Sequence, residues 1–230
     1  MEPVEGARNA AGQRRAGQYA SERYHRGLRN YRRRFYRNVL WAIVLVGLVE
    51  LGIAMYLDNT FGWTAFAFML GAFVAGIWLV RDIPPDHIRR WGDGAWGEQQ
   101  TAKALLPLEQ AGWKVQHDIE LERGNIDHLA ESPSGRRFVL ETKTLQGRLK
   151  VEDGYLTSAQ LDDPEQVYQH TSLRHVLLGR ARHQYRESRR GWVQAVVVIW
   201  GEFPQRCVED GKLVFLHGDE LASWLGKRAS

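Results

Sequence analysis

The sequence predicts an α/β protein in which a mixed sheet is flanked by helices and preceded by a transmembrane helical hairpin. Two apolar runs near the start of the chain, residues 39–57 and 62–80, predict the hairpin. Alternation of helical and strand patterns after residue 95 predicts the α/β domain. Residues 193–200 form a continuous, β-branched apolar run, which is typical of a strand buried on both faces.

Charge divides the chain into unequal parts. The 230 residues carry a formal net charge of +4, but ten arginines against five acidic residues give residues 1–80 a charge of +5. The rest of the chain is close to neutral, so the basic character belongs to the leader. The single cysteine, Cys207, excludes an internal disulfide and every zinc site built from several cysteines. We expect four parts: an Arg-rich cytoplasmic leader (1–38), the hairpin (39–80), a linker (81–94) and one domain (95–230).

The expected topology of the hairpin follows from its flanks. Each apolar run is long enough to cross a hydrocarbon core of about 30 Å as a helix. Only residues 58–61 connect the two runs, so both outer ends should lie on the same side. Arginines flank these outer ends and the connection has none, and the positive-inside rule then places both termini and the domain in the cytoplasm, at an inner or plasma membrane. A buried, soluble helical hairpin is the alternative.

Two further features accompany the hairpin. Glu50 lies near the middle of the first run, where a charge is costly, so we expect it to be protonated, paired or turned toward another helix. A helix-packing contact, or a contact that makes a homo-oligomer, is favoured over a transport role. The Arg-rich leader also contains several aromatic residues. It is expected to bind anionic lipid head groups, with nucleic acid as the alternative.

The elements of the domain are read from hydrophobic periodicity and turn residues. A helix is expected over residues 95–112, with Pro107 kinking or splitting it. Strands are expected at 113–121, 126–131, 137–143 and 193–200, with a short one at 149–151 and another at 212–216. A second helix is expected from Pro164 to about residue 190, and Asp219 is expected to cap a last helix.

Three acidic residues and one lysine stand out by position. Glu98 lies on the first helix, and Asp127 lies at the start of a strand. Glu141 and Lys143 end the next strand and point to the same face, because strand side chains alternate. The hairpin neighbour brings Asp127 close to that face. Two carboxylates there suit a hard cation such as Mg²⁺, and the lysine could orient or deprotonate a water, which is a layout for hydrolysing a phosphodiester.

These residues carry a resemblance to a known family. The motifs Gly97-Glu98, Asn125-Ile126-Asp127-His128 and Val139-Leu140-Glu141-Thr142-Lys143 resemble the nuclease-related domain, NERD, a family similar to the PD-(D/E)xK endonucleases. The resemblance implies a restriction-endonuclease-like core over about residues 97–190. It implies a catalytic centre of Asp127, Glu141 and Lys143 supported by Glu98, with Asp127 and Glu141 holding Mg²⁺ or Mn²⁺. In this family an Asn-Pro often precedes a functional Gln; here Asp163-Pro164 precedes Gln166, the candidate at that position.

The function expected from these observations is a membrane-tethered, metal-dependent nuclease that acts on DNA or RNA. Arginines on the helix after Pro164 suit a phosphate backbone, or else form a solvated helix face. The alternative function is an inactive module that binds nucleic acid or protein at the membrane, and the near-neutral charge of the domain favours it. A third is a membrane sensor built around Glu50. His128 is expected to be packed or hydrogen-bonded rather than a metal ligand.

Overall fold

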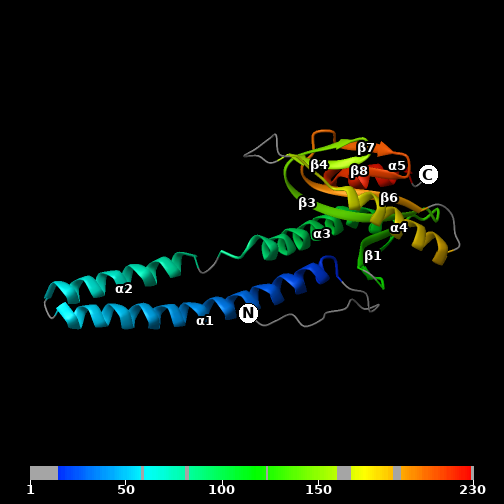
Figure 1. Cartoon of the computed structure of the whole chain (residues 1–230). Helices are drawn as coiled ribbons and strands as arrows, with labels where there is room; N and C mark the ends of the chain where they lie inside the picture. The colour runs from blue at the N-terminus through cyan, green and yellow to red at the C-terminus, as the bar shows by residue number, and fades with distance from the viewer. Residues whose placement is uncertain are drawn as a thin grey trace. The chain divides into compact units, whose positions relative to one another are not determined.

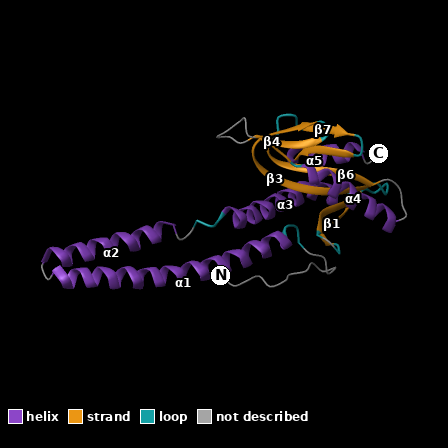
Figure 2. Cartoon of the chain, viewed as in Figure 1, coloured by secondary structure: helices purple, strands orange, loops and turns teal. Residues whose placement is uncertain are grey.

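The computed structural model describes residues 15–57, 60–80, 83–122, 124–159, 167–188 and 193–228. The chain forms two units. Among the described residues, 15–21 join those from Gly92 onward in one unit, and those within Glu22–Trp91 form the other. The elements are drawn in Figure 1 and coloured by type in Figure 2. The helices are α1 (Gln18–Leu57), α2 (Thr60–Val80), α3 (Asp86–Gln110), α4 (Thr171–Ser188) and α5 (Leu221–Arg228).

The larger unit is built on one mixed sheet, as predicted. Its central order is β1-β2-β3-β6-β8-β7, with β4 pairing with β3 and β5 pairing with β4. Strand β6 runs parallel to both of its neighbours, β3 and β8, and the other pairs are antiparallel. The strands are β1 (Lys114–Glu120), β2 (Asn125–Glu131), β3 (Arg137–Glu152), β4 (Tyr155–Ala159), β5 (Val167–Gln169), β6 (Val193–Glu202), β7 (Cys207–Asp210) and β8 (Leu213–His217).

Helices cover both faces of this sheet (Figure 2). Leu173 and Leu177 of α4 pack into one apolar cluster with the sheet. Leu105 of α3 and Leu225 of α5 pack into the other cluster, on the opposite face. Residues of β6 alternate between the two clusters, so this strand is buried on both faces, which confirms the interpretation of its apolar run.

Several predicted boundaries are wrong. Helix α3 begins at Asp86, so residues 86–94 of the expected linker are helical. It also continues past Pro107 to Gln110, so the helix is not split there. Pro107 lies in the last turn, where its missing N–H removes only one hydrogen bond near the end of the helix. Strand β3 includes both the expected strand at 137–143 and the short one at 149–151, with a register shift between Thr144 and Arg148. Strands β4, β5 and β7 were not predicted.

The helix expected from Pro164 begins later. Residues 160–166 lie outside the described part of the chain, and the next residues form β5 before α4 starts at Thr171. At the last helix, Asp219 is not the cap. It lies inside a 3-10 turn, Gly218–Glu220, and the side chain of His217 accepts the N–H of Asp219 instead.

The smaller unit holds most of the two apolar helices. One helical stretch in the described residues, Gln18–Ile53, is long and apolar enough to cross a membrane, and the apolar stretch Gly62–Trp78 is shorter. Near their outer ends, the hydroxyl of Tyr31 donates to the carbonyl of Ile83 over 3.3 Å. Helices at both apolar runs agree with the prediction. A bilayer crossing by both stays a prediction.

Candidate active site

Asp127 lies where strands β2 and β3 separate. Their backbone pairing begins at Glu131 and Arg137 and ends at His128 and Leu140. At the next step the carboxylate of Asp127 takes the place of a backbone carbonyl, because its Oδ2 accepts the N–H of Thr142 over 2.7 Å. The side chain is buried. The end of the ladder therefore holds a carboxylate at a fixed position beside β3.

Glu141 is the centre of an ion-pair network on β3. Lys143 lies two residues farther along the strand and donates from Nζ to Glu141 Oε1 over 2.7 Å, as expected from strand alternation. Arg180 of α4 donates to the other oxygen, Oε2. All three side chains are at least two-thirds buried. Arg180 was predicted only as one of several basic residues on a helix, because nothing in the sequence says which face of that helix meets the sheet.

Glu98 is brought to the same region by close contact between α3 and β3. A Cβ on Gly97 would lie 2.0 Å from Thr144 Oγ1, so only glycine allows this approach. One turn along α3, Thr101 Oγ1 lies 2.9 Å from Thr142 Oγ1. Trp200 Nε1 of β6 donates to the same Thr101 oxygen over 2.8 Å. These contacts fix the rotation of α3, and hence the direction of Glu98.

The acidic groups raise one another's pKa. Burial, followed by the nearby carboxylates of Asp118 and Glu141, raises the pKa of Glu98 to about 7. Burial, then Glu141 and Glu98, raises the pKa of Asp127 well above its usual range. Burial acts to lower the pKa of Lys143, but Glu141 and Asp127 outweigh it and the pKa is raised. A raised pKa favours the protonated form of Lys143, which suits orienting a water or stabilising negative charge better than deprotonating the water.

A further acid, Asp118, was missed in the sequence. It is 2% exposed and has a left-handed backbone, with φ of 50°, in the middle of β1. Its Oδ1 accepts from Asn125 Nδ2 over 2.9 Å, and its Oδ2 accepts the backbone N–H of Tyr19 over 2.8 Å. Alternation along β1 gives no reason to single it out, because its role depends on Tyr19, a residue 99 positions away.

This arrangement was compared with known proteins. Residues 93–200 match the model of the NERD family, the nuclease-related domain. The match covers just under half of the chain and includes all of the residues described above except Tyr19. No curated protein and no solved structure gives a significant match. The resemblance noted in the sequence is thus confirmed at the level of the NERD family.

The NERD-like site fits a divalent cation by the chemistry of its donors. Within the described ranges no group of three or more His, Cys, Asp or Glu side chains has the spacing of a metal centre. However, Oε2 of Glu98 is buried without a hydrogen-bond partner, and three mutually repelling carboxylates share one region. Carboxylate oxygens that repel one another are ligands of the kind that Mg²⁺ or Mn²⁺ prefers. Asp127 and Glu141 would hold the cation, with Glu98 beside them; Gln166 lies outside the described residues.

His128 is buried against a second histidine. Its Nδ1 lies 2.7 Å from Nδ1 of His117, and its Nε2 is buried without a partner. This agrees with the expected packed role. One ring must accept while the other donates, so the pair requires at least one neutral imidazole.

We expect this histidine pair to make folding stability depend on acid pH. Burial lowers the pKa of His117, and burial together with His117 lowers that of His128 well below 6.5. A folded-state pKa below the unfolded value means that protons favour the unfolded chain. The contribution of the two neutral histidines to the free energy of unfolding is therefore complete above about pH 6.5 and is lost as pH falls. Thermal unfolding between pH 7.5 and 5 should show a smaller decrease for His128→Leu than for the unaltered protein; an equal decrease would contradict the assignment.

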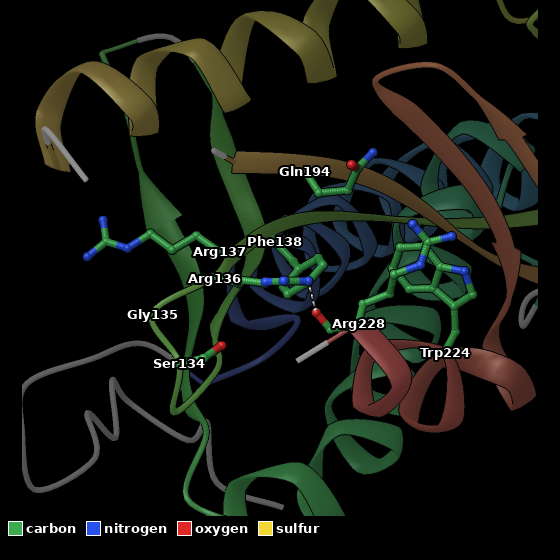
Figure 3. A pocket seen from close by; sticks show the side chains of 8 residues that line it. All are labelled: Ser134, Gly135, Arg136, Arg137, Phe138, Gln194, Trp224 and Arg228. Carbon is green, nitrogen blue, oxygen red and sulfur yellow. Dashed lines mark hydrogen bonds between the residues drawn. The ribbon is translucent and has the colours of Figure 1, made fainter. Parts of the chain in front are cut away.

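A hollow of about 440 Å³ lies at the other end of β3, where the strand begins. Figure 3 shows its lining, which includes Arg136, Arg137, Trp224 and Arg228. Each guanidinium already has a partner: Arg136 donates to the carbonyl of Arg228, Arg137 pairs with Glu131, and Arg228 pairs with Glu209. The basic character of the hollow is largely neutralised, and the predicted site residues lie elsewhere.

Proposed function

We propose that the NERD-like domain is a divalent-cation-dependent nuclease tethered to a membrane. One observation carries the proposal: Asp127, Glu141 and Lys143 lie beside Glu98. The first three are held on two neighbouring strands of the sheet, and Glu98 is held on the helix that packs against them. Carboxylates that bind a cation next to a fixed ammonium group match the needs of phosphodiester hydrolysis, in which negative charge develops on phosphate oxygens.

The chain's own residues have distinct roles in this mechanism. The cation, when bound by Asp127 and Glu141, supplies polarisation of the phosphate and of a water. Lys143 is protonated and donates to Glu141 Oε1, so it stabilises developing negative charge rather than acting as a base. Glu98 has a pKa of about 7 and an unpartnered Oε2, which suits a group that takes a proton from water at neutral pH.

Nucleic acid would approach along α4. Arg174 and Arg180 of this helix are held by Asp210 and Glu141. Arg182 and Arg186 are exposed and lie four residues apart, and therefore on one side of the helix. Such a pair can contact successive phosphates without reading sequence. Whether the strand is DNA or RNA, and whether it is cut internally or from an end, is decided by the substrates tested below.

One observation favours the alternative function, an inactive binding module. Both oxygens of Glu141 already accept from cations, Lys143 and Arg180. If this network stays closed, Glu141 is a structural acid and the domain binds without cleaving. The cleavage test separates the two functions.

The test uses the full chain in detergent or lipid discs, with DNA and RNA in single- and double-stranded form. We expect cleavage with Mg²⁺ or Mn²⁺ and none with a chelator. No cleavage of any substrate, together with no cation binding, would overturn the nuclease proposal; retained nucleic-acid binding would then support the module.

Cation binding should release protons, because Glu98 and Asp127 have raised pKa values in the cation-free site. Glu98 has a pKa of about 7, so it holds a proton below that pH and the cation must displace it. The affinity of the site for the cation should therefore increase as pH rises through about 7. Calorimetry in two buffers of different ionisation enthalpy measures the released protons. Glu98→Gln should release fewer protons, and an unchanged number would contradict the role of Glu98.

The proposed tether is the hairpin of α1 and α2. Large apolar side chains of both helices are exposed, among them Trp41, Leu45 and Phe68. By the positive-inside rule, the Arg-rich flanks support a cytoplasmic domain in this proposal. Glu50 is 9% exposed, and its Oε2 has no hydrogen-bond partner within the described residues. Because the side chain is covered within this chain, we keep the proposal of a helix-packing contact, since a carboxylate in a bilayer needs a polar or packed environment.

Cys207 provides a direct test of this topology. It is the only cysteine, and it is exposed on β7 of the domain. A membrane-impermeant maleimide should label it in inside-out vesicles and not in sealed right-side-out cells. Cys207→Ser gives the background. Labelling from outside intact cells would contradict a cytoplasmic domain.

A further inference from the structure

The turn that precedes α1 lies against two acids of the candidate site, within the larger unit. The backbone N–H of Tyr19 donates to Asp118 Oδ2 over 2.8 Å, and the backbone N–H of Gly17 lies near the carboxylate of Glu98, where it acts to lower the pKa of that group. Gly17 has a φ of 72°, and a Cβ there would lie 2.8 Å from the carbonyl oxygen of Ala95. We call residues 15–19 the N-terminal turn.

These contacts give α1 a cap that its own sequence lacks. The first N–H groups of a helix have no partner inside it, and a carboxylate or hydroxyl side chain usually accepts them. The first turn of α1 contains no acidic residue, and Ala16 and Gly17 precede it. Asp118 and Glu98 take the place of a local cap. Asp118 lies 99 positions after Tyr19, and Glu98 lies 81 positions after Gly17. Asp118 keeps a left-handed backbone in this position.

We infer that the N-terminal turn and the divalent cation compete for Glu98, so that binding of the turn holds the site in a cation-poor state. This inference rests on the proposed cation-dependent function. It assigns a regulatory role to residues 15–19 and to Asp118, which lie outside the proposed catalytic set.

The competition has an electrostatic cause. The N-terminus of a helix carries a positive charge of roughly half an elementary charge, which attracts carboxylates and repels a cation placed on the same carboxylates. The N–H of Gly17 already stabilises the charged form of Glu98. Coupling of two binding events is reciprocal. A cation at Glu98 should therefore weaken binding of the turn by the same factor by which the turn weakens binding of the cation.

A proline at position 19 tests the contact with little other change. Proline is tolerated in the first turn of a helix, because the N–H that it lacks has no partner inside the helix. Tyr19→Pro removes the hydrogen bond to Asp118, and Tyr19→Ala removes the same side chain but keeps the N–H. Calorimetry of Mn²⁺ binding to the full chain should show an affinity up to about tenfold higher in Tyr19→Pro than in Tyr19→Ala, since one charge-assisted hydrogen bond is lost from the competing state.

Gly17→Ala reaches the same result by another route. It keeps every N–H but places a Cβ against the carbonyl oxygen of Ala95 at an unfavourable φ, so the turn should detach. Its Mn²⁺ affinity should rise as in Tyr19→Pro. This variant keeps the test decisive if Tyr19→Pro does not fold.

Hydrogen exchange gives a measurement that does not depend on activity. In the unaltered protein, Mn²⁺ should speed amide exchange in the peptide that covers residues 15–21, and Gly17→Ala should show fast exchange without Mn²⁺. Slower exchange with Mn²⁺, or equal or weaker affinity in Tyr19→Pro and Gly17→Ala, would overturn the competition while leaving the cation site standing. No Mn²⁺ binding in any variant would overturn the cation site itself, and the competition with it.

Discussion

Lys143→Met is expected to decrease kcat for cation-dependent cleavage by about a hundred- to a thousandfold, because a fixed charge that stabilises the developing negative charge contributes on this scale. Methionine has a similar length but offers no proton. Lys143 donates to Glu141 Oε1 over 2.7 Å, so the ammonium group has a defined position in the site. Initial rates of cleavage at saturating Mg²⁺, with substrate binding measured separately, give the result.

Lys150→Met is the matched control on the same strand. Lys150 also pairs with a glutamate two residues away, Glu152, over 2.6 Å, but both side chains are more than half exposed. Exposed pairs contribute little to stability, so this variant should keep full activity. If Lys143→Met is folded, binds the cation and still cleaves at the rate of Lys150→Met, then Lys143 has no catalytic role.

Gly97→Ala is expected to destabilise the domain by about 1–3 kcal/mol and also to reduce cleavage. The new methyl group would lie 2.0 Å from Thr144 Oγ1 and 3.1 Å from Thr142 Cγ2, so α3 must move away from β3. Glu98 is the next residue and moves with the helix. Chemical denaturation measures the loss of stability, and the cleavage rate of the folded variant at saturating cation measures the second effect.

Gly94→Ala separates this steric effect from the effect of glycine itself. Gly94 lies on the same helix, and a Cβ there meets nothing within 4 Å. Replacing a helical glycine by alanine removes conformational freedom from the unfolded chain, and should stabilise the domain by up to about 1 kcal/mol. A loss of stability in both variants would show that close packing at Gly97 is not the cause.

Local sequence patterns predicted the elements whose burial is regular. The apolar run of β6 and the strand pattern at β2 depend only on neighbours in the chain, and both strands were predicted correctly. The exposed strands β5 and β7 were missed because they bury few side chains and leave no hydrophobic period. Residues 92–94 were misread as a linker because their two glycines outweighed the helical context on either side.

The residues of the candidate site also divide into those that local sequence patterns identify and those that they do not. Glu98, Asp127, Glu141 and Lys143 were identified from motif and strand alternation, and the structure brings them together. Arg180 and Asp118 were not identified, since their partners come from a helix face and from a turn at the far end of the chain. No local pattern carries such information.

The larger unit is discontinuous in sequence, and this has a consequence for its synthesis and for its handling as a fragment. Residues 15–21 are synthesised before Asp118, so the hydrogen bond from Tyr19 can form only after Asp118 has been made. Because residues 22–91 form a unit of their own, folding of that unit shortens the effective loop that has to be closed. Any fragment that starts at residue 84 or later loses this segment and leaves Asp118 with an acceptor to satisfy by water. Measurements on such a fragment therefore describe a domain that lacks its N-terminal turn.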